Sequence, residues 1–211
     1  MPEASSPLTY LALGDSYTIG EGVAPHERWP MQLVAALRRD GIAVDDPRII
    51  ATTGWTTDEL SAAMDAAEPL GTWGFVSLLI GVNNQYRGRD AGEYEQQFDA
   101  LLRRAASLAG GRAGRVLVLS IPDWGVTPFA RTDGAEPSRV ERALDDYNAR
   151  ARLRCEAAGV AFVDITPVSR TRGAEPAMLV ADGLHPSGAM YALWVAQALP
   201  VARRLLAETR P

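Results

Sequence analysis

The sequence contains no lysine, one cysteine and two histidines. Cys155 therefore has no partner for an internal disulfide, and its helical surroundings predict a small core or surface residue rather than a nucleophile. No apolar run reaches the roughly 18 residues that suggest a membrane-spanning helix, so we expect none. Met1–Thr9 shows no basic segment followed by a long apolar one, which predicts the absence of a signal peptide and a cytoplasmic protein.

The positive charge is carried by arginine alone, with 21 basic residues against 26 acidic ones and a net charge of −5. This balance lacks the basic footprint of nucleic-acid-binding proteins, so we expect no nucleic-acid partner. The missing lysine, beside many alanines, indicates coding bias rather than function. A hydrophobic content of 47% is typical of globular proteins, and a length of 211 residues predicts a single domain, 1–211.

Short apolar runs alternate with longer segments of helical period. The runs are rich in valine, isoleucine and leucine and show little alternation, as expected for parallel strands buried on both faces. They predict strands at Thr9–Leu13, Arg48–Ala51, Phe75–Ile80, Arg115–Ile121 and Val160–Asp164. Helices are predicted at Trp29–Arg39, from near Thr56, at Ala91–Leu108, at Ser138–Ala158 and from after Pro186, with Ser187 as the cap, to about Ala207. The alternation predicts an α/β fold with a five-stranded parallel sheet covered on both faces.

Three local details refine this scheme. Thr56 and Glu59 have the spacing of a capping box at a helix start. Pro200 should kink or interrupt the last helix. Pro122–Pro137 and Thr166–Gly183 read as long irregular loops, which in compact domains are often functional.

Four fragments with polar or glycine residues follow predicted strands. Ser16 follows the first strand, Gly54 the second and Asn83 the third, while Asp182–His185 lies between the fifth strand and the last helix. Ligands of open parallel sheets bind outside the carboxyl ends of the strands. We therefore expect all four fragments at one edge of the sheet, around one site.

The residue types in these fragments suit acyl transfer, which needs a nucleophile, a base and donors for an oxyanion. Ser16, on a tight turn after a buried strand, is the candidate nucleophile, and His185 is the candidate base. The other histidine, His26, lies in a polar approach to a helix and is interpreted as a surface residue. Asp182 is the candidate acid that orients His185, with Asp164 as the rival.

The candidate oxyanion donors are the backbone N–H groups of Ser16 and Gly54 and the side-chain amide of Asn83. Gly54 and Asn83 also fit an alternative interpretation as ordinary turn formers. Asp15 adjoins the nucleophile, but an immediate neighbour points elsewhere, so we expect it to brace the turn by hydrogen bonds.

In their order and spacing, these fragments resemble the SGNH (GDSL) hydrolase family. The resemblance rests on Gly14-Asp15-Ser16, a glycine after strand two, Gly81-Val82-Asn83, and Asp182-Gly183-Leu184-His185, and it covers nearly the whole chain. It implies a three-layer α/β/α, flavodoxin-like fold and serine ester hydrolysis without metal or cofactor.

The resemblance also carries the family's roles onto this chain. The nucleophile role falls on Ser16, the oxyanion roles on Gly54 and Asn83, and the acid and base roles on Asp182 and His185. Two positions depart from the family pattern. Tyr17 stands where the family name has leucine, and Asn84 stands where an aspartate often follows the asparagine.

The substrate is less constrained than the reaction. We expect a small-molecule ester with a short acyl chain; lysophospholipid, thioester and carbohydrate acetyl esters remain alternatives within the class. Outside it, an acyltransferase or a non-catalytic binding module on the same fold remains open. Trp55, Trp73, Trp124 and Phe129 are available to line a pocket or to pack in the core, and Arg87 and Arg89 to meet an anion or to form a solvated face.

Overall fold

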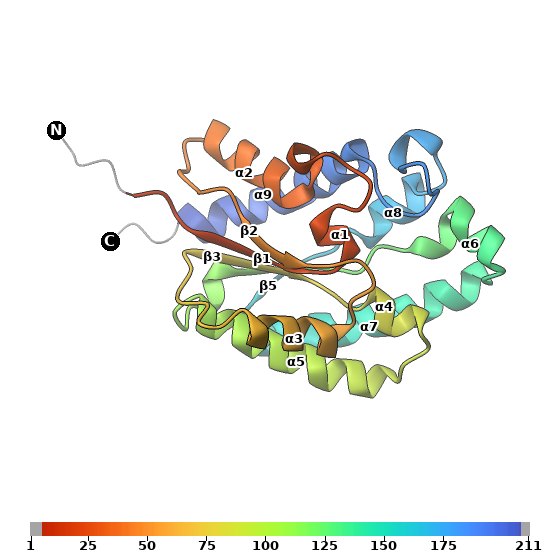
Figure 1. The fold of residues 1–211 in the computed structure, drawn as a ribbon, viewed down its shortest axis with the longest axis horizontal. Helices are drawn as coiled ribbons and strands as arrows, with labels where there is room; N and C mark the ends of the chain where they lie inside the picture. The colour runs from red at the N-terminus through yellow and green to blue at the C-terminus, as the bar shows by residue number, and fades with distance from the viewer. Residues whose placement is uncertain (1–5, 208–211) are drawn as a thin grey trace.

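A five-stranded parallel sheet lies at the centre of the protein in a computed structural model that describes residues 6–207 (Figure 1). The strand order is β2-β1-β3-β4-β5. The strands are β1 (Tyr10–Gly14), β2 (Arg48–Ala51), β3 (Phe75–Leu79), β4 (Val116–Leu119) and β5 (Ala161–Val163). The predicted α/β fold with a five-stranded parallel sheet is confirmed, and each strand lies within a residue or two of its predicted range.

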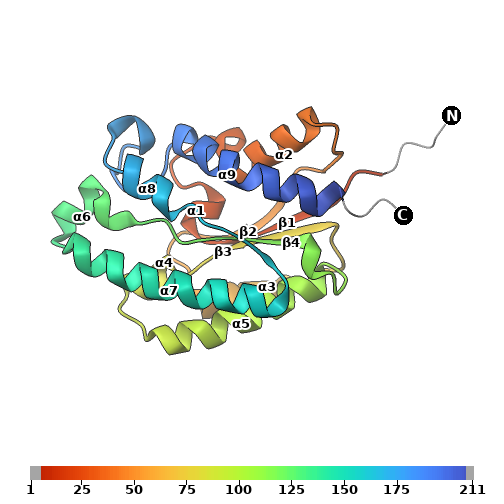
Figure 2. The same cartoon turned by 180° about the vertical axis from the view of Figure 1, so that it is seen from behind.

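Helices cover both faces of this sheet (Figures 1 and 2). One face carries α2 (Trp29–Arg39), α9 (Gly188–Ala207) and α8 (Thr166–Arg172), and α2 packs closely on α9. The other face carries α3 (Thr57–Ala66), α5 (Ala91–Leu108) and α7 (Pro137–Ala158). The predicted three-layer arrangement is therefore present.

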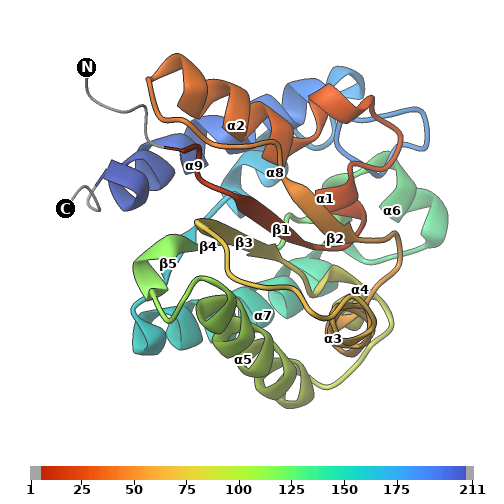
Figure 3. The same ribbon diagram turned by 60° about the vertical axis from the view of Figure 1, so that its left-hand side comes forward.

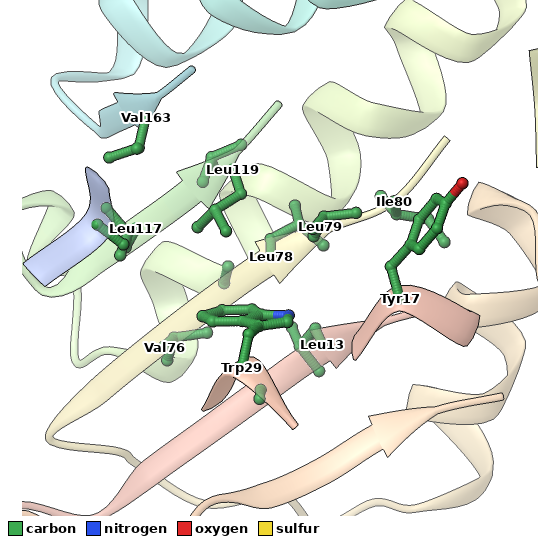
Figure 4. Packing of buried hydrophobic residues seen from close by; sticks show 14 of the residues in the cluster. Leu13, Tyr17, Trp29, Val76, Leu78, Leu79, Ile80, Leu117, Leu119 and Val163 are labelled. Carbon is green, nitrogen blue, oxygen red and sulfur yellow. The ribbon is translucent and has the colours of Figure 1, made fainter. Parts of the chain in front are cut away.

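The core lies on both sides of the central strands. Every residue of β1, β3 and β4 is buried, which explains why these strands read as continuous apolar runs. Figure 4 shows part of this cluster, with Trp29 and Tyr17 beside leucines and valines of the strands. The burial of large side chains from both helical layers ties the layers to the sheet.

Strands β1, β2 and β3 end level with one another, so the residues that follow them meet at one edge of the sheet. In the parallel register, Gly14 of β1 lies opposite Ala51 of β2 and Leu79 of β3. The segments that follow these three strands therefore leave the sheet at the same height. The strand order also reverses direction between β1 and β3, because β2 lies on one side of β1 and β3 on the other. Such a switch point opens a crevice for ligands.

Three short helices at this edge were not predicted: α1 (Ser16–Ile19), α4 (Val82–Tyr86) and α6 (Pro128–Asp133) (Figure 3). The sequence suggested turns or an irregular loop at these places. The second predicted loop likewise contains α8 and a 3₁₀ turn at Pro176–Met178. These helices are only one or two turns long, too short to show a hydrophobic period.

Pro200 was expected to kink or interrupt the last helix, and the interruption does not occur. Helix α9 continues through Pro200 to Ala207. Residues on both sides of the proline, among them Ala198 and Ala202, are fully buried, so packing holds the helix together where local preference alone would end it. Among the described helices, none is long and apolar enough to cross a membrane.

Candidate active site

Ser16 is the first residue of α1, immediately beyond the end of β1. Asp15 occupies the N-cap position, and its Oδ1 accepts a hydrogen bond from the backbone N–H of Tyr17 at 3.0 Å. The predicted bracing role of Asp15 is thus confirmed. The cap fixes the turn between strand and helix, and the Ser16 side chain lines a pocket at the sheet edge.

The Asp15 carboxyl is fully buried beneath this turn. Its second oxygen, Oδ2, has no hydrogen-bond partner within the described part of the chain. Burial disfavours the charged form and raises the pKa of Asp15 to about 7, against the lowering effect of the Tyr17 N–H. Asp15 is therefore a poor candidate for a group that must stay ionised.

Gly54 lies in the segment between β2 and α3. Its φ of 89° is in the left-handed region, which a residue with a Cβ adopts only with strain. The Gly54 carbonyl accepts a hydrogen bond of 2.6 Å from Arg87 Nη2, and the neighbouring Thr53 hydroxyl bonds the Glu21 carboxylate. Gly54 and Thr53 both line the same pocket as Ser16.

Asn83 belongs to α4, the short helix that follows β3. The turn into this helix requires Gly81, because its φ is 129° and a Cβ there would lie 2.5 Å from the Tyr94 ring. Asn83 Nδ2 donates to the Trp55 carbonyl at 2.9 Å, which ties α4 to the Gly54 segment. A primary amide has two N–H donors, so one remains to face a ligand in the pocket that Asn83 lines.

Asn84, the second departure from the family pattern, has a structural role. The side chain is fully buried; Oδ1 accepts from the Thr57 N–H at 3.0 Å and Nδ2 donates to the Thr57 hydroxyl at 2.7 Å. Both the donor and the acceptor of the amide are used, which a carboxylate could not do. Asn84 thus joins α4 to the start of α3.

Asp182 and His185 share a tight turn before α9. A bridge between Leu179 and Pro186 closes the base of this turn. Asp182 Oδ2 lies 2.6 Å from His185 Nδ1, while Oδ1 accepts from the backbone N–H groups of Leu184 and His185 at 2.8 and 2.9 Å. The carboxylate therefore fixes the imidazole ring and the backbone that carries it.

The electrostatics of this pair favour an ionised carboxylate. Partial burial would raise the pKa of Asp182, but the hydrogen bonds from the His185 ring and from the two N–H groups outweigh it and lower the pKa below its usual value. The rival acid and the second histidine of the sequence do not belong to this turn. Asp164 bonds Ser120 and Arg152, and His26 is exposed on a 3₁₀ turn before α2.

A pocket of about 170 Å³ brings these fragments together. Four of the five predicted site residues line it, namely Ser16, Gly54, Asn83 and His185, and Asp182 holds His185 from behind. In the structure, no hydrogen bond joins the described side chains of Ser16 and His185; such bonds commonly tighten only when substrate is bound. The remaining lining is largely apolar: Tyr17, Thr53, Val82, Tyr86, Trp124, Phe129 and Leu184.

The aromatic candidates divide between pocket and packing. Trp124 and Phe129 line the pocket, with their ring centroids 6.2 Å apart, whereas Trp55 and Trp73 are not part of its wall. Tyr86 was missed, although its centroid lies 5.3 Å from that of Trp124. Its helix was not predicted, so the sequence offered no signal that this ring faces the site.

The structure also gives the surroundings of the two arginines and of the cysteine that the sequence singled out. Arg87 pairs with Glu59, and Arg89 pairs with both Asp58 and Glu93, so each guanidinium already has an acidic partner. Cys155 is fully buried, and burial raises the pKa of its thiol to about 12. Within residues 6–207, no three His, Cys, Asp or Glu side chains gather as metal ligands would.

Comparison with known proteins gave one family match. The model described as the GDSL-like lipase/acylhydrolase family matches residues 12–193. A search of curated proteins found no match.

Solved structures similar to this one share its fold at low sequence identity. TesA is 20% identical, with a TM-score of 0.72, over 93% of this chain and 99% of its own. The psychrotrophic esterase EstA from Pseudoalteromonas sp., inhibited by monoethylphosphonate, is 15% identical with a TM-score of 0.72, over 94% and 98%. Axe2, an acetylxylan esterase from Geobacillus stearothermophilus, is 20% identical with a TM-score of 0.67, over 95% and 94%.

Proposed function

The chain belongs to the GDSL-like lipase/acylhydrolase family and is a carboxylic ester hydrolase, and from this premise we propose that it cleaves short-chain acyl esters with Ser16 as nucleophile. One observation carries the proposal. Ser16, an imidazole held by a carboxylate, and two candidate oxyanion donors meet at one small pocket at the switch point of the sheet.

In the proposed reaction, His185 Nε2 accepts the proton of the Ser16 hydroxyl as Oγ attacks the carbonyl carbon of the ester. Asp182 keeps the other ring nitrogen, Nδ1, as the protonated one and stabilises the imidazolium that forms. The resulting oxyanion accepts hydrogen bonds from the backbone N–H groups of Ser16 and Gly54 and from the Asn83 amide.

The tetrahedral intermediate then collapses. The bond to the alcohol oxygen breaks, and His185 returns its proton to the leaving alcohol, which gives an acyl-serine. A water molecule, deprotonated by the same imidazole, attacks the acyl carbon and releases the carboxylic acid and free Ser16. No step needs a metal or a cofactor.

The size and lining of the pocket support a short acyl group. Its volume of about 170 Å³ lies below the roughly 300–1,000 Å³ of pockets for drug-sized ligands. Its wall is formed mainly by Val82, Leu184 and the rings of Tyr86, Trp124 and Phe129. An acetyl or butyryl group fits such an enclosure better than a long chain.

A panel of nitrophenyl esters, from acetyl to long-chain acyl, tests the proposal. We expect turnover to be highest for the short chains and to be lost in Ser16→Ala, while Ser61→Ala, in α3 and outside the lining of the Ser16 pocket, keeps the wild-type rate. Full turnover by Ser16→Ala would refute the nucleophile. A preference for long chains would instead favour a lysophospholipase or thioesterase.

A further inference from the structure

We propose that Arg87 is a positioning residue that holds the Gly54 segment, and with it one oxyanion donor, in its working geometry. The inference rests on the proposed function, in which the Gly54 N–H stabilises the oxyanion. It assigns a task to a charged side chain that takes no part in binding or chemistry itself.

Two contacts fix the Arg87 guanidinium. Nη2 donates to the Gly54 carbonyl at 2.6 Å, and Nη1 lies 3.2 Å from Glu59 Oε1. The first contact is short, as expected where the donor carries a charge. Glu59 is itself fixed, because its Oε2 accepts from the backbone N–H of Thr56 at 2.8 Å as part of the capping box of α3. The guanidinium therefore bridges the Gly54 segment to a rigid helix start.

The Gly54 segment needs such a restraint. Glycine has the largest conformational freedom of any residue, and Gly54 has a φ of 89°. Around an ideal Cβ at this position, the one heavy atom of the described residues within 4 Å, chain neighbours aside, is Arg87 Nη2 at 3.8 Å. The space beside Gly54 is thus largely open, and the bond from Arg87 adds to two others that hold the segment: Trp55 N–H to the Thr52 carbonyl at 3.3 Å and the Asn83 amide to the Trp55 carbonyl at 2.9 Å.

Two side chains from α4 and its C-terminal end, those of Asn83 and Arg87, hold the segment that carries Gly54. Asn83 and Arg87 are four residues apart, so their side chains leave the helix on the same side. Asn83 donates to the carbonyl of Trp55, and Arg87 donates to the carbonyl of Gly54. Two successive carbonyls after β2 are therefore held by side chains from a single turn after β3, which ties the Gly54 segment to the segment that carries Asn83.

Arginine suits this task better than lysine. Its planar fork reaches the Gly54 carbonyl and Glu59 at the same time, whereas an ammonium acts as a point charge. Arg87 is not part of the pocket wall, and 46% of its side chain is exposed. Loss of the side chain should therefore change the rate of the chemical step more than substrate binding.

Steady-state kinetics with nitrophenyl acetate separate these effects. Displacement of a catalytic group by about 1 Å can cost about 10²-fold, so we expect Arg87→Ala to lower kcat by at least about 10-fold with little change in KM. Arg87→Lys should retain part of the rate. Arg89→Ala is the matched control, since Arg89 pairs with Asp58 and Glu93 and has no contact with Gly54, and it should keep wild-type kinetics.

Chemical rescue adds a readout that a general loss of structure would not give. Guanidinium chloride at low, non-denaturing concentration should restore part of the kcat of Arg87→Ala but not affect Arg89→Ala or Ser16→Ala. If Arg87→Ala does not fold, Glu59→Gln provides a second test. Glu59→Gln keeps a capping residue at the start of α3 while it removes the negative charge that faces Arg87, and it should lower kcat in the same sense to a smaller extent.

Three results would overturn the inference: kcat within about 2-fold of wild type in folded Arg87→Ala, a rise in KM at constant kcat, or an equal loss in Arg89→Ala. The first result, seen with an active wild-type enzyme and an inactive Ser16→Ala, would remove only the role of Arg87. An inactive wild-type enzyme would instead remove the proposed function.

Discussion

Asp182 uses both of its carboxylate oxygens, one on the His185 ring and one on the backbone of the same turn. Asp164, its rival in the sequence, also uses both oxygens, but its partners are Ser120, Thr166 and Arg152 rather than a histidine. The sequence could propose both aspartates because both follow the fifth strand. Only the three-dimensional turn decides which of them reaches the imidazole.

Asp182→Asn should lower kcat by about 10³–10⁴-fold, because an amide facing Nδ1 favours the wrong imidazole tautomer and cannot stabilise the imidazolium. Asp164→Asn is the matched control and should stay within about 2-fold of wild type, since it loses a surface ion pair. Both variants would be assayed with nitrophenyl acetate. The opposite ranking would make Asp164 the acid.

Asp15 gives a stability prediction whose sign follows from its raised pKa. Between the ordinary value of 3.8 and the folded value of about 7, the unfolded chain releases this proton while the folded protein keeps it. Stability contributed by Asp15 therefore falls as pH rises through this window and is constant above it.

Asp15→Asn lacks this titration, so its free energy of unfolding relative to wild type should rise from pH 5 to pH 8 by roughly 2–3 kcal/mol, at about 1.4 kcal/mol per pKa unit. Urea unfolding at the two pH values measures it. The exposed Asp45→Asn is the control and should show no such trend. A difference between Asp15→Asn and wild type that is independent of pH would contradict the burial of an uncharged Asp15.

Individual hydrogen bonds could be predicted where they join residues close in sequence, and not where they join residues far apart. The hydrogen bond by which Asp15 braces the turn joins residues two apart, and this bracing was predicted, although the helix that it caps was not. The bond from Arg87 to the Gly54 carbonyl joins residues 33 apart, and no pattern in the sequence signals it. Asn84 was noted as a departure, but its bonds to Thr57 appear only when α4 meets α3.

Helix α4 concentrates much of the site in a little more than one turn. One side of this short segment carries Asn83, Tyr86 and Arg87. Asn83 and Tyr86 line the pocket, and Arg87 bonds the Gly54 carbonyl; we propose that they serve as oxyanion donor, pocket wall and restraint. The ring of Tyr86 also lines a second cavity of about 420 Å³. Tyr86 and Trp124 line both spaces, and the Tyr86 hydroxyl donates to Asp133 of α6 at 3.1 Å.

Tyr86→Ala should therefore join the two cavities and relax the limit on acyl length. We expect the ratio of octanoyl to acetyl nitrophenyl ester kcat/KM to rise about 10-fold, since each methylene that leaves water gains up to about 0.8 kcal/mol. Phe129→Ala is the control, because Phe129 lines the Ser16 pocket but not the second cavity. An unchanged ratio in Tyr86→Ala, or an equal rise in Phe129→Ala, would contradict Tyr86 as the divider.

Long elements were predicted well and short ones were not. The range of α5 matches its prediction, and that of α7 differs by one residue, because long helices show a clear period and end at glycines. Helix α6 could have been found from its ends, since Thr127 caps it, Pro128 opens it and Gly134 closes it in the left-handed conformation. Helices α1 and α4 offer too few residues for any period.

At the scale of the whole molecule, the core sets stability and the strand ends carry the site. Leu78 of β3 is fully buried, with Leu13 and Val118 as its neighbours on the adjacent strands. The fragments of the candidate site lie beyond the ends of these strands. Stability and catalysis should therefore respond separately to substitution.

Leu78→Ala should lower the free energy of unfolding by about 2–5 kcal/mol, through lost burial and the cavity left behind, while kcat of the folded protein stays near wild type. Leu153, which is 62% exposed, provides the control, and Leu153→Ala should change stability by less than about 0.5 kcal/mol. Urea unfolding and active-site titration would measure both. A large loss of kcat at unchanged stability would place Leu78 in the site instead.

The overall architecture was predictable because it follows from composition and order. Five apolar runs separated by helical segments leave few alternatives to a parallel sheet with helices on both faces. The shared edge of the four polar fragments follows from the same rule. The shape of the pocket does not, because its walls come from short helices and loops that are fixed only by packing.

Reaction with a fluorophosphonate probe, followed by mass spectrometry of the peptides, tests the central claim most directly. The account predicts a single covalent adduct on Ser16, absent in Ser16→Ala and formed much more slowly in His185→Ala. A folded wild-type protein that takes up no probe, or that carries the adduct on another residue, would contradict Ser16 as the nucleophile.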